Sequence, residues 1–522
     1  MLGAARLAQG QYTSDDGMQV LTRGPIHEAF AEAAMTGAVA GVVVKRVPPD
    51  PIAELPPVQR PEGYNVAWIP GYWSWDDDRN DFIWVSGVWR DLPPGRQWVP
   101  GYWTPAGRGA QWISGYWANA AQTEVSYLPA PPKSYESGPS SPSPGPNTIW
   151  SPGCWIWQQS GYAWQPGYWV AQQPDWVWSP AHYTWTPRGY VYVGGYWDHD
   201  IVHRGVMFAP IHYNRPVYTR PNYSYSPSTV IDLLVVAAAL FVQPRTNHYY
   251  YSDYYDSRYE RRGIYPWYSK QATRYGEDPL YAHYRSTQLR RDPDWVNHMA
   301  EQYRYRRDHV DARPPQTLAH QINIINNLKA KAPRDFVIGR HLADFIQSKT
   351  LPLRFTPVNV DERKQIERRG QEVNRFQLER RRLESAPVAS GRTKAPPKTT
   401  QQPVRLRMPA SPVAARPIQN VQGVKAPPPI PVAPKPQAID RRGRPMKPQK
   451  VEAQPNVQPR PQRTETPQQM KPQRVESKPE VRSQQQPEPK AQSPRSDTNN
   501  RSDKHGRAHG KKDNKNKKRN DR

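Results

Sequence analysis

The sequence has a single cysteine, few phenylalanines and no long apolar run. Its 522 residues include 1 Cys and 8 Phe against 20 Trp and 30 Tyr. One thiol excludes an intramolecular disulfide and a cysteine-based zinc site, and Cys154 occupies a position where sister repeats carry Tyr. The best apolar stretch, 230–242, contains Asp232 and is shorter than the ~20 residues of a membrane helix. We expect a buried strand or a short core helix there.

Aliphatic residues are also too scarce for a chain folded throughout. Hydrophobic residues make up 36% of the sequence and prolines number 61, so only part of the chain can form a packed core. Of the 20 Trp, 18 fall between Trp68 and Trp197. The core must therefore consist largely of Trp and Tyr, whose polar groups need hydrogen-bond partners.

The net charge of +26 is concentrated at one end of the chain. Residues 386–522 hold 31 Lys/Arg and 10 Asp/Glu, which leaves about +5 for the other 385 residues. The polyelectrolyte character therefore belongs to the tail and not to the folded part.

A hexapeptide of the form Trp-x-x-Gly-x-Trp recurs between residues 68 and 197. First positions step by 16, 14 and 14 residues in one block and by 14 residues throughout the next. A fixed period in two blocks indicates a repeat architecture. The copies are Trp68-Ile-Pro-Gly-Tyr-Trp73, Trp84-Val-Ser-Gly-Val-Trp89, Trp98-Val-Pro-Gly-Tyr-Trp103, Trp112-Ile-Ser-Gly-Tyr-Trp117, Trp150-Ser-Pro-Gly-Cys-Trp155, Trp164-Gln-Pro-Gly-Tyr-Trp169, Trp178-Ser-Pro-Ala-His-Tyr183 and Tyr192-Val-Gly-Gly-Tyr-Trp197.

Two β geometries fit the hexapeptide. Its Pro-Gly pair could be a turn that places the two Trp of one copy across a hairpin. Alternatively the hexapeptide lies within one strand, and a bulge at Gly returns both Trp to one face. Turn residues already fill the intervening segments such as 104–109, which favours the second geometry, although Pro disfavours a central strand. Both geometries give a mainly β fold, an antiparallel aromatic-repeat meander of two four-unit blocks.

The composition divides the chain into segments. We expect the two repeat blocks to be followed by a mixed Tyr-rich region, a charged helix with heptad spacing that could form a short coiled coil, and a long disordered tail. The boundaries are a lead segment and Pro-rich connector at 1–63, repeat block 1 at 64–127, a Pro/Ser linker at 128–147, repeat block 2 at 148–205, a Tyr/Arg-rich accessory region at 206–312, a helical segment at 313–385 and a basic Pro/Gln-rich tail at 386–522.

Motifs that could carry chemistry are weak. Asp76, Asp78 and Asn80 match the start of a calcium loop, but the Gly and the bidentate Glu that complete such a loop are missing, so a solvated hairpin loop is the preferred interpretation. His199 and His203 would share a face only on a helix, and they follow a repeat directly. No nucleophile elbow, phosphate loop or metalloprotease motif occurs. We expect no catalytic residue, no cofactor and no resident metal.

Three sets of residues are candidates for the core and for binding. Regular spacing assigns the Trp residues to the core: Trp68, Trp73, Trp84, Trp89, Trp98, Trp103, Trp112, Trp117, Trp150, Trp155, Trp164, Trp169, Trp178 and Trp197. The Tyr residues that precede the second Trp should face the other side and form a ligand face: Tyr72, Tyr102, Tyr116, Tyr168 and Tyr196. The cationic terminus could bind polyanions through counterion release: Lys511, Lys512, Lys515, Lys517, Lys518 and Arg519.

The hexapeptides resemble the WxxGxW, or YXWGXW, repeat family of bacterial proteins. That resemblance implies an exported repeat protein without an assigned molecular function. The first ten residues resemble the end of a signal peptide, so we expect a misassigned start and an exported protein, with the cytoplasm as the alternative.

We therefore expect a non-enzymatic scaffold or binding protein of the cell envelope or exterior. Its partner would be an anionic envelope polymer, a glycan or another envelope protein. The alternatives are a carbohydrate-binding module that uses exposed Tyr residues and a polyanion- or nucleic-acid-associated protein that acts through its tail. Export would make nucleic acid the least suitable partner.

Overall fold

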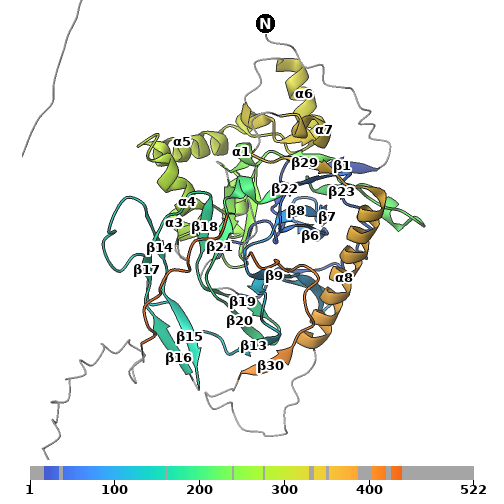
Figure 1. Ribbon diagram of the computed structural model, residues 1–522. Helices are drawn as coiled ribbons and strands as arrows, with labels where there is room; N and C mark the ends of the chain where they lie inside the picture. The colour runs from blue at the N-terminus through green and yellow to red at the C-terminus, as the bar shows by residue number, and fades with distance from the viewer. Residues whose placement is uncertain are drawn as a thin grey trace, which may run out of the picture. The chain divides into compact units, whose positions relative to one another are not determined.

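Antiparallel strands dominate the computed structural model, which confirms the predicted mainly β class (Figure 1). The structure describes residues 17–34, 39–159, 161–237, 240–273, 277–328, 334–348, 352–385, 403–418 and 425–437. The first ten residues and the cationic terminus, including Lys511 to Arg519, lie outside the described residues.

The repeats form four long hairpins, each built from two hexapeptides. We name them hairpin 1 (66–91), hairpin 2 (96–119), hairpin 3 (148–171) and hairpin 4 (176–199). In each, an outer pair of strand segments and an inner pair are joined by short breaks in the strands. The segments are β5 (Val66–Ile69), β6 (Tyr72–Asp76), β7 (Asp81–Val85), β8 (Val88–Asp91), β9 (Arg96–Val99), β10 (Tyr102–Ala106), β11 (Gly109–Ile113), β12 (Tyr116–Asn119), β14 (Thr148–Ser151), β15 (Cys154–Gln158), β16 (Gly161–Gln165), β17 (Tyr168–Ala171), β18 (Trp176–Ser179), β19 (His182–Thr186), β20 (Gly189–Val193) and β21 (Tyr196–His199).

The Trp residues pair between hexapeptides and not within one. In hairpin 1, Trp68 lies opposite Trp89 and Trp73 lies opposite Trp84. The ring centroids of these two pairs are 5.2 and 5.3 Å apart in edge-to-face geometry, which suits the quadrupoles of aromatic rings. The turn geometry for the hexapeptide is therefore wrong. The chain does continue through the hexapeptide, but the strand breaks there instead of bulging.

Each break, which we call a corner, consists of the two residues before the second strand segment. In hairpin 1 the corners are Pro70-Gly71 and Ser86-Gly87. Proline has no amide hydrogen for a ladder, so the sheet ends where it stands. The inner strands β6 and β7 belong to one sheet, and the outer strands β5 and β8 belong to another. The two corners therefore divide the strand segments of one hairpin between two sheets.

The segments outside the repeats add edge strands to the hairpins and build a separate sheet. β23 pairs with β7, β22 pairs with β8, and β13 pairs with β20. These remaining strands are β1 (Met18–Val20), β2 (Gly24–Pro25), β3 (Val43–Val44), β4 (Gln59–Pro61), β13 (Glu124–Leu128), β22 (Gly205–Met207), β23 (Ile211–Tyr213), β24 (Thr229–Ile231), β25 (Leu240–Gln243), β26 (His248–Tyr251), β27 (Tyr265–Pro266), β28 (Gly339–His341), β29 (Phe355–Pro357) and β30 (Val404–Arg407).

Helices follow the repeats in the chain. They are α1 (Leu233–Val236), α2 (Ser257–Arg261), α3 (Lys270–Thr273), α4 (Pro279–Gln288), α5 (Trp295–Asp308), α6 (Leu318–Leu328), α7 (Leu342–Ile346) and α8 (Val360–Ser385). Among the described residues, none of the helices is both long enough and apolar enough to cross a membrane.

The charged helix predicted within the segment 313–385 is α8, which packs on the repeats (Figure 1). Val373 and Phe376, two residues with heptad spacing, are buried in the main core. Arg380 occupies another such position and is also fully buried, paired with Glu384 at 3.0 Å. The heptad face therefore covers the hairpins of its own chain.

Two stretches of the predicted tail are ordered against the hairpins, unlike the disorder expected for 386–522. We call residues 403–418 the strap. Its strand β30 pairs with β13, and Ala414 forms a bridge with Gln97 of β9. A second stretch, 425–437, reaches hairpin 3, where Gln437 and Trp164 exchange backbone hydrogen bonds of 2.7 and 3.0 Å. Backbone pairing along strand edges explains how a segment with few aromatics is held in place.

Candidate functional site: the repeat corners and the grooves beside them

A buried glutamate bridges the two corners of hairpin 1. The carboxylate of Glu54 accepts hydrogen bonds from the amides of Gly71 at 2.6 Å and Gly87 at 2.9 Å, and from the indole of Trp84 at 3.1 Å. Glu54 lies on the Pro-rich lead, 17 residues before Gly71. The lead is thus a structural brace for the first hairpin and not only a connector.

Hairpin 3 repeats this arrangement. Glu136 accepts hydrogen bonds from Gly153 and Gly167, both at 2.9 Å. It also precedes the first corner glycine by 17 residues, within the segment predicted as a linker. Each of these hairpins is therefore closed by the Pro-rich segment immediately before it.

The other two hairpins use glutamates from one distant segment near residue 30. Glu28 accepts from the amide of Gly115 at 3.0 Å and from the indole of Trp112 at 2.8 Å in hairpin 2. Glu32 pairs with His182 of hairpin 4 at 2.9 Å, where His replaces the usual Tyr. Four hairpins are thus each contacted by a glutamate from outside the repeat, of which Glu28 and Glu54 are buried and Glu32 and Glu136 are half-buried.

These contacts explain why the fourth position of the hexapeptide is glycine. A Cβ on Gly87 would lie 2.5 Å from Cζ2 of Trp68 and 2.7 Å from Oε2 of Glu54. A Cβ on Gly153 would lie 2.4 Å from Cζ2 of Trp164. The glycine lets the opposite indole cover the corner while its amide reaches the carboxylate.

Burial perturbs the titration of the groups around the corners. Desolvation raises the pKa of Glu54 to about 7, although its three donors favour the carboxylate. Desolvation also lowers the pKa of His27 to about 4. The ring of His27 lies within 3.1 Å of both the Ala29 amide and the Pro70 carbonyl, an arrangement that a neutral ring satisfies because one nitrogen accepts and the other donates.

The Trp residues assigned to the core are mostly buried. Twelve of the fourteen are buried, while Trp103 and Trp169 are half-buried. Both half-buried indoles still donate hydrogen bonds, from Trp103 to the carbonyl of Trp73 at 2.8 Å and from Trp169 to the carbonyl of Ser141 at 3.3 Å.

The structure does not form the exposed tyrosine face expected from the repeat register. Tyr102, Tyr116 and Tyr196 are at most 3% exposed, because other segments cover this side of the strands too. Tyr102 donates to Glu384 of α8 at 2.8 Å, and the Arg96 guanidinium lies 4.4 Å from the ring centre of Tyr196.

The other two tyrosines of that set are half-buried. Tyr72 stacks on Trp112 with ring centres 5.0 Å apart, and its hydroxyl accepts a hydrogen bond from the Glu28 amide at 3.2 Å. Tyr168 packs against the apolar cluster of hairpins 3 and 4. None of the five tyrosines therefore stands free as a stacking platform.

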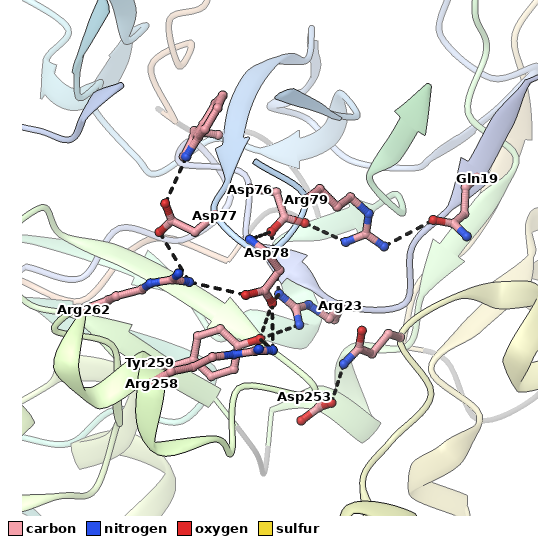
Figure 2. Close-up of polar contacts among 12 residues, drawn as sticks. Gln19, Arg23, Asp76, Asp77, Asp78, Arg79, Asp253, Arg258, Tyr259 and Arg262 are labelled. Atoms are coloured by element: carbon pink, nitrogen blue, oxygen red, sulfur yellow. Dashed lines mark hydrogen bonds and ion pairs between the residues drawn. The ribbon is translucent and has the colours of Figure 1, made fainter. Parts of the chain in front are cut away.

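The acidic loop of hairpin 1 binds arginines and does not gather oxygens around a cation (Figure 2). Asp78 accepts from Arg23 at 2.7 Å and also pairs with Arg258 and Arg262. Asp76 pairs with Arg79 at 2.7 Å. Asn80 adopts φ 49°, as hairpin loops often require. The loop therefore fastens the hairpin to α2, and the calcium-loop interpretation of Asp76, Asp78 and Asn80 fails because protein cations occupy the carboxylates.

The histidine motif after hairpin 4 is likewise part of an ionic cluster. Asp198 accepts from the buried Arg90 at 2.5 Å and pairs with Arg204 at 3.0 Å. His199 and His203 each lie 3.9 Å from a separate aspartate. Among the described residues, no group of three or more His, Cys, Asp or Glu side chains is arranged to hold a metal ion.

Two open grooves border the hairpins. One, of about 280 Å³, lies between hairpins 1 and 2, the lead segment and α8, and its walls include Trp103, Asn374, Gln377 and Arg381. The other, of about 970 Å³, is lined by hairpins 2 and 4 and by both ordered tail stretches. The smaller groove combines aromatic rings on one wall with amide and guanidinium groups on the other.

Sequence reasoning missed the four bracing glutamates. The equal 17-residue spacing from Glu54 to Gly71 and from Glu136 to Gly153 was a signal within the sequence. Glu28 and Glu32 offered no such signal, because the residues they contact lie more than 80 residues further along the chain.

The comparisons with known proteins identify the repeats. A family model described as the WXXGXW repeat, two copies, matches residues 63–90, 98–118, 145–170 and 174–198. Each match covers one hairpin, so the two copies of the model correspond to the two hexapeptides that pair in it. Searches of curated proteins and of solved structures find no match.

Proposed function

Since the chain is a WxxGxW repeat-containing protein, we propose that it is a non-enzymatic scaffold of the bacterial cell envelope or exterior whose hairpins hold extended chain segments. The observation that carries this proposal is that segments from outside the repeats already bind to the hairpins. Four indoles donate to backbone carbonyls of segments from outside the repeats: Trp73 to Asp50 at 2.9 Å, Trp155 to Lys133 at 3.0 Å, Trp169 to Ser141 at 3.3 Å and Trp197 to Pro429 at 3.0 Å.

Proline-rich segments suit such a surface. They are already extended, so they lose little conformational entropy on binding, and their carbonyls remain free to accept hydrogen bonds. Asp50 and Pro429 both lie in runs of prolines. A scaffold with this surface would organise extended peptides, first those of its own chain.

Localisation tests the envelope part of this proposal. The chromosomal copy, tagged at its carboxyl terminus, should fractionate with the envelope or the medium, and its mature amino terminus should be a processed one. A tagged protein that remains in the cytoplasm with Met1 intact would contradict export. A known cytoplasmic protein and a known exported protein serve as fractionation controls.

The smaller groove supports a second candidate function, carbohydrate binding. Sugars are held by aromatic faces together with planar hydrogen-bonding groups, and this groove offers Trp103 opposite Asn374 and Arg381. This location differs from the predicted one, because Tyr102 is buried against α8.

A glycan array with the full chain tests the second candidate. Binding with a Kd below about 1 mM that is lost in Trp103→Ala and Arg381→Ala would support it. Arg375→Ala, an exposed position on α8 that does not line the groove, is the matched control. If no glycan binds, the carbohydrate-binding candidate is excluded and only the scaffold proposal remains of the two.

The third alternative, polyanion binding through the tail, concerns Lys511 to Arg519. Deleting 451–522 removes this cluster and 9 of the 21 surplus positive charges of residues 386–522, so it should weaken binding to anionic polymers at low salt. Unchanged binding would exclude residues 451–522 as its source.

A further inference from the structure

The strap contributes to the core of the repeat domain, although a long connection joins it to that domain. Met408, Val413 and Ala415 belong to the main apolar cluster and are 1–7% exposed. Residues 386–402 connect Ser385 of α8 to the strap. A connection of 17 residues can span at most roughly 56 Å.

The strap occupies a site made of backbone edges, which we call the seat. β30 continues the sheet at β13, with Ser126 opposite Arg405 and Val125 opposite Leu406. Further on, the amide of Trp98 donates to the carbonyl of Val413 at 2.8 Å, and the amide of Ala415 donates to the carbonyl of Arg96 at 2.8 Å. Most of the recognition is therefore between main chains.

Side chains set the register of the strap in the seat. The hydroxyl of Ser411 donates to the carbonyl of Trp98 at 2.6 Å, and the side chain of Asn65 exchanges hydrogen bonds with the backbone of Arg416 at 2.8 and 3.2 Å. An arriving strap of identical sequence would find every one of these partners.

A seat without its strap would present two open strand edges and an incomplete apolar cluster. Open edges recruit extended chains, and exchange of an identical element between copies costs little because each contact is remade. We propose that the seat also accepts the strap of a second copy of this chain, so that copies become linked through strand exchange. This proposal rests on the proposed role of the hairpins as holders of extended segments.

Disulfide trapping in the full chain tests the exchange. One variant carries Ser126→Cys in the seat, and the other carries Arg405→Cys in the strap, directly opposite in the register. The native Cys154 is buried, and burial raises the pKa of its thiol to about 12, so it should not compete. After the two variants are mixed and mildly oxidised, we expect a covalent heterodimer whose 126–405 link is identified by mass spectrometry.

Two controls separate exchange from random collision. Thr148→Cys and Ala171→Cys lie opposite each other across hairpin 3, with similar exposure to the first pair, but they cannot exchange unless the hairpin unfolds. The double variant Ser126→Cys/Arg405→Cys, oxidised before mixing, locks its own strap and should not form the heterodimer.

The heterodimer yield should rise with protein concentration, since the tethered strap competes at an effective concentration in the millimolar range. Because the disulfide traps each event, a small exchanged population suffices. The proposal is wrong if the double variant forms its own 126–405 disulfide while the mixed single variants form no such link between copies. An equal yield from the hairpin 3 pair would overturn it too. Neither result would alter the outcome of the localisation test.

Discussion

The corner glutamates show what a single carboxylate withdrawn from solvent can do in a repeat. Glu54 and Glu136 each accept hydrogen bonds from two corner amides, which would otherwise be donors without partners inside the fold. A buried charge is costly, and these amides offset its desolvation through charge-assisted hydrogen bonds. The carboxylate therefore joins two hexapeptides at the point where neither has a strand partner.

Glu54→Gln should lower the stability of the fold. The amide nitrogen that replaces one oxygen would face a glycine N–H, which leaves a donor unsatisfied at a cost of about 1–3 kcal/mol. Thermal unfolding measures the effect. Glu62→Gln, an exposed position eight residues away, is the control and should leave Tm unchanged. Equal Tm values for both variants would show that the carboxylate does not brace the corner.

His27 makes the fold sensitive to acid. Its pKa is about 4 in the folded chain against about 6.5 when unfolded, so the unfolded state takes up the proton first as the pH falls. The stability that this ring contributes is complete above pH 6.5 and is lost between about pH 6.5 and 4, by up to roughly 3 kcal/mol.

Urea unfolding at several pH values tests this residue. His27→Gln does not titrate, so its free energy of unfolding should fall less steeply than that of the wild type across this window. Parallel pH profiles for the two proteins would contradict the assignment.

At the scale of the element, each hexapeptide contains one corner and packs against the hexapeptide on the opposite side of the hairpin. Its Trp residues pack against those of the next hexapeptide, and its glycine lies under the opposite indole. This explains why the copies occur in even numbers and why the family model covers two at a time.

Gly153→Ala should disrupt hairpin 3 because the new methyl group would overlap the Trp164 ring. We expect a loss of about 1–3 kcal/mol from overpacking, with altered near-ultraviolet circular dichroism from the Trp155–Trp164 pair. Gly161→Ala in the same hairpin has open space around its Cβ and is the matched control. A Gly153→Ala protein as stable as the control would refute the corner geometry.

Helix α8 is held by an ion pair inside the protein. Arg380 also donates to the carbonyl of Pro100 at 2.7 Å, so it connects the helix to a corner of hairpin 2. Arg380→Met leaves the Glu384 carboxylate buried without its cation, which should cost about 3–5 kcal/mol. Arg382→Met removes the exposed pair with Glu379 and should change the free energy of unfolding by less than about 1 kcal/mol. Similar losses in chemical denaturation would contradict the burial of Arg380.

For the molecule as a whole, we expect the parts of the carboxyl-terminal region to differ in their effect on stability, because the strap belongs to the core. A chain ending at residue 450 keeps the strap and the 425–437 stretch, so its Tm should equal that of the full chain. A chain ending at 402 loses the apolar anchors Met408 and Val413 and exposes two strand edges, so it should melt at a lower temperature and aggregate sooner. Equal melting of the two truncated chains would show that the strap is dispensable.

The mainly β class, the antiparallel repeat architecture and the charged helix could all be predicted, because they follow from local periodicity. The burial of Tyr102 and the role of Glu28 could not, since both depend on segments more than 80 residues away. Composition also misled at the strap: its sequence resembles the rest of the Pro-rich tail, yet its backbone amides and carbonyls pair with β9 and β13.

The origin of the four bracing glutamates has a consequence for synthesis on the ribosome. Hairpins 1 and 3 receive their carboxylates from residues already made, so each can close as soon as its own second hexapeptide emerges. Glu28 must wait for hairpin 2 and for His248, and Glu32 must wait for hairpin 4. The segment near residue 30 is therefore made before hairpins 2 and 4 but finds its partners only after them, and an alanine-rich stretch with two glutamates stays available to chaperones until then.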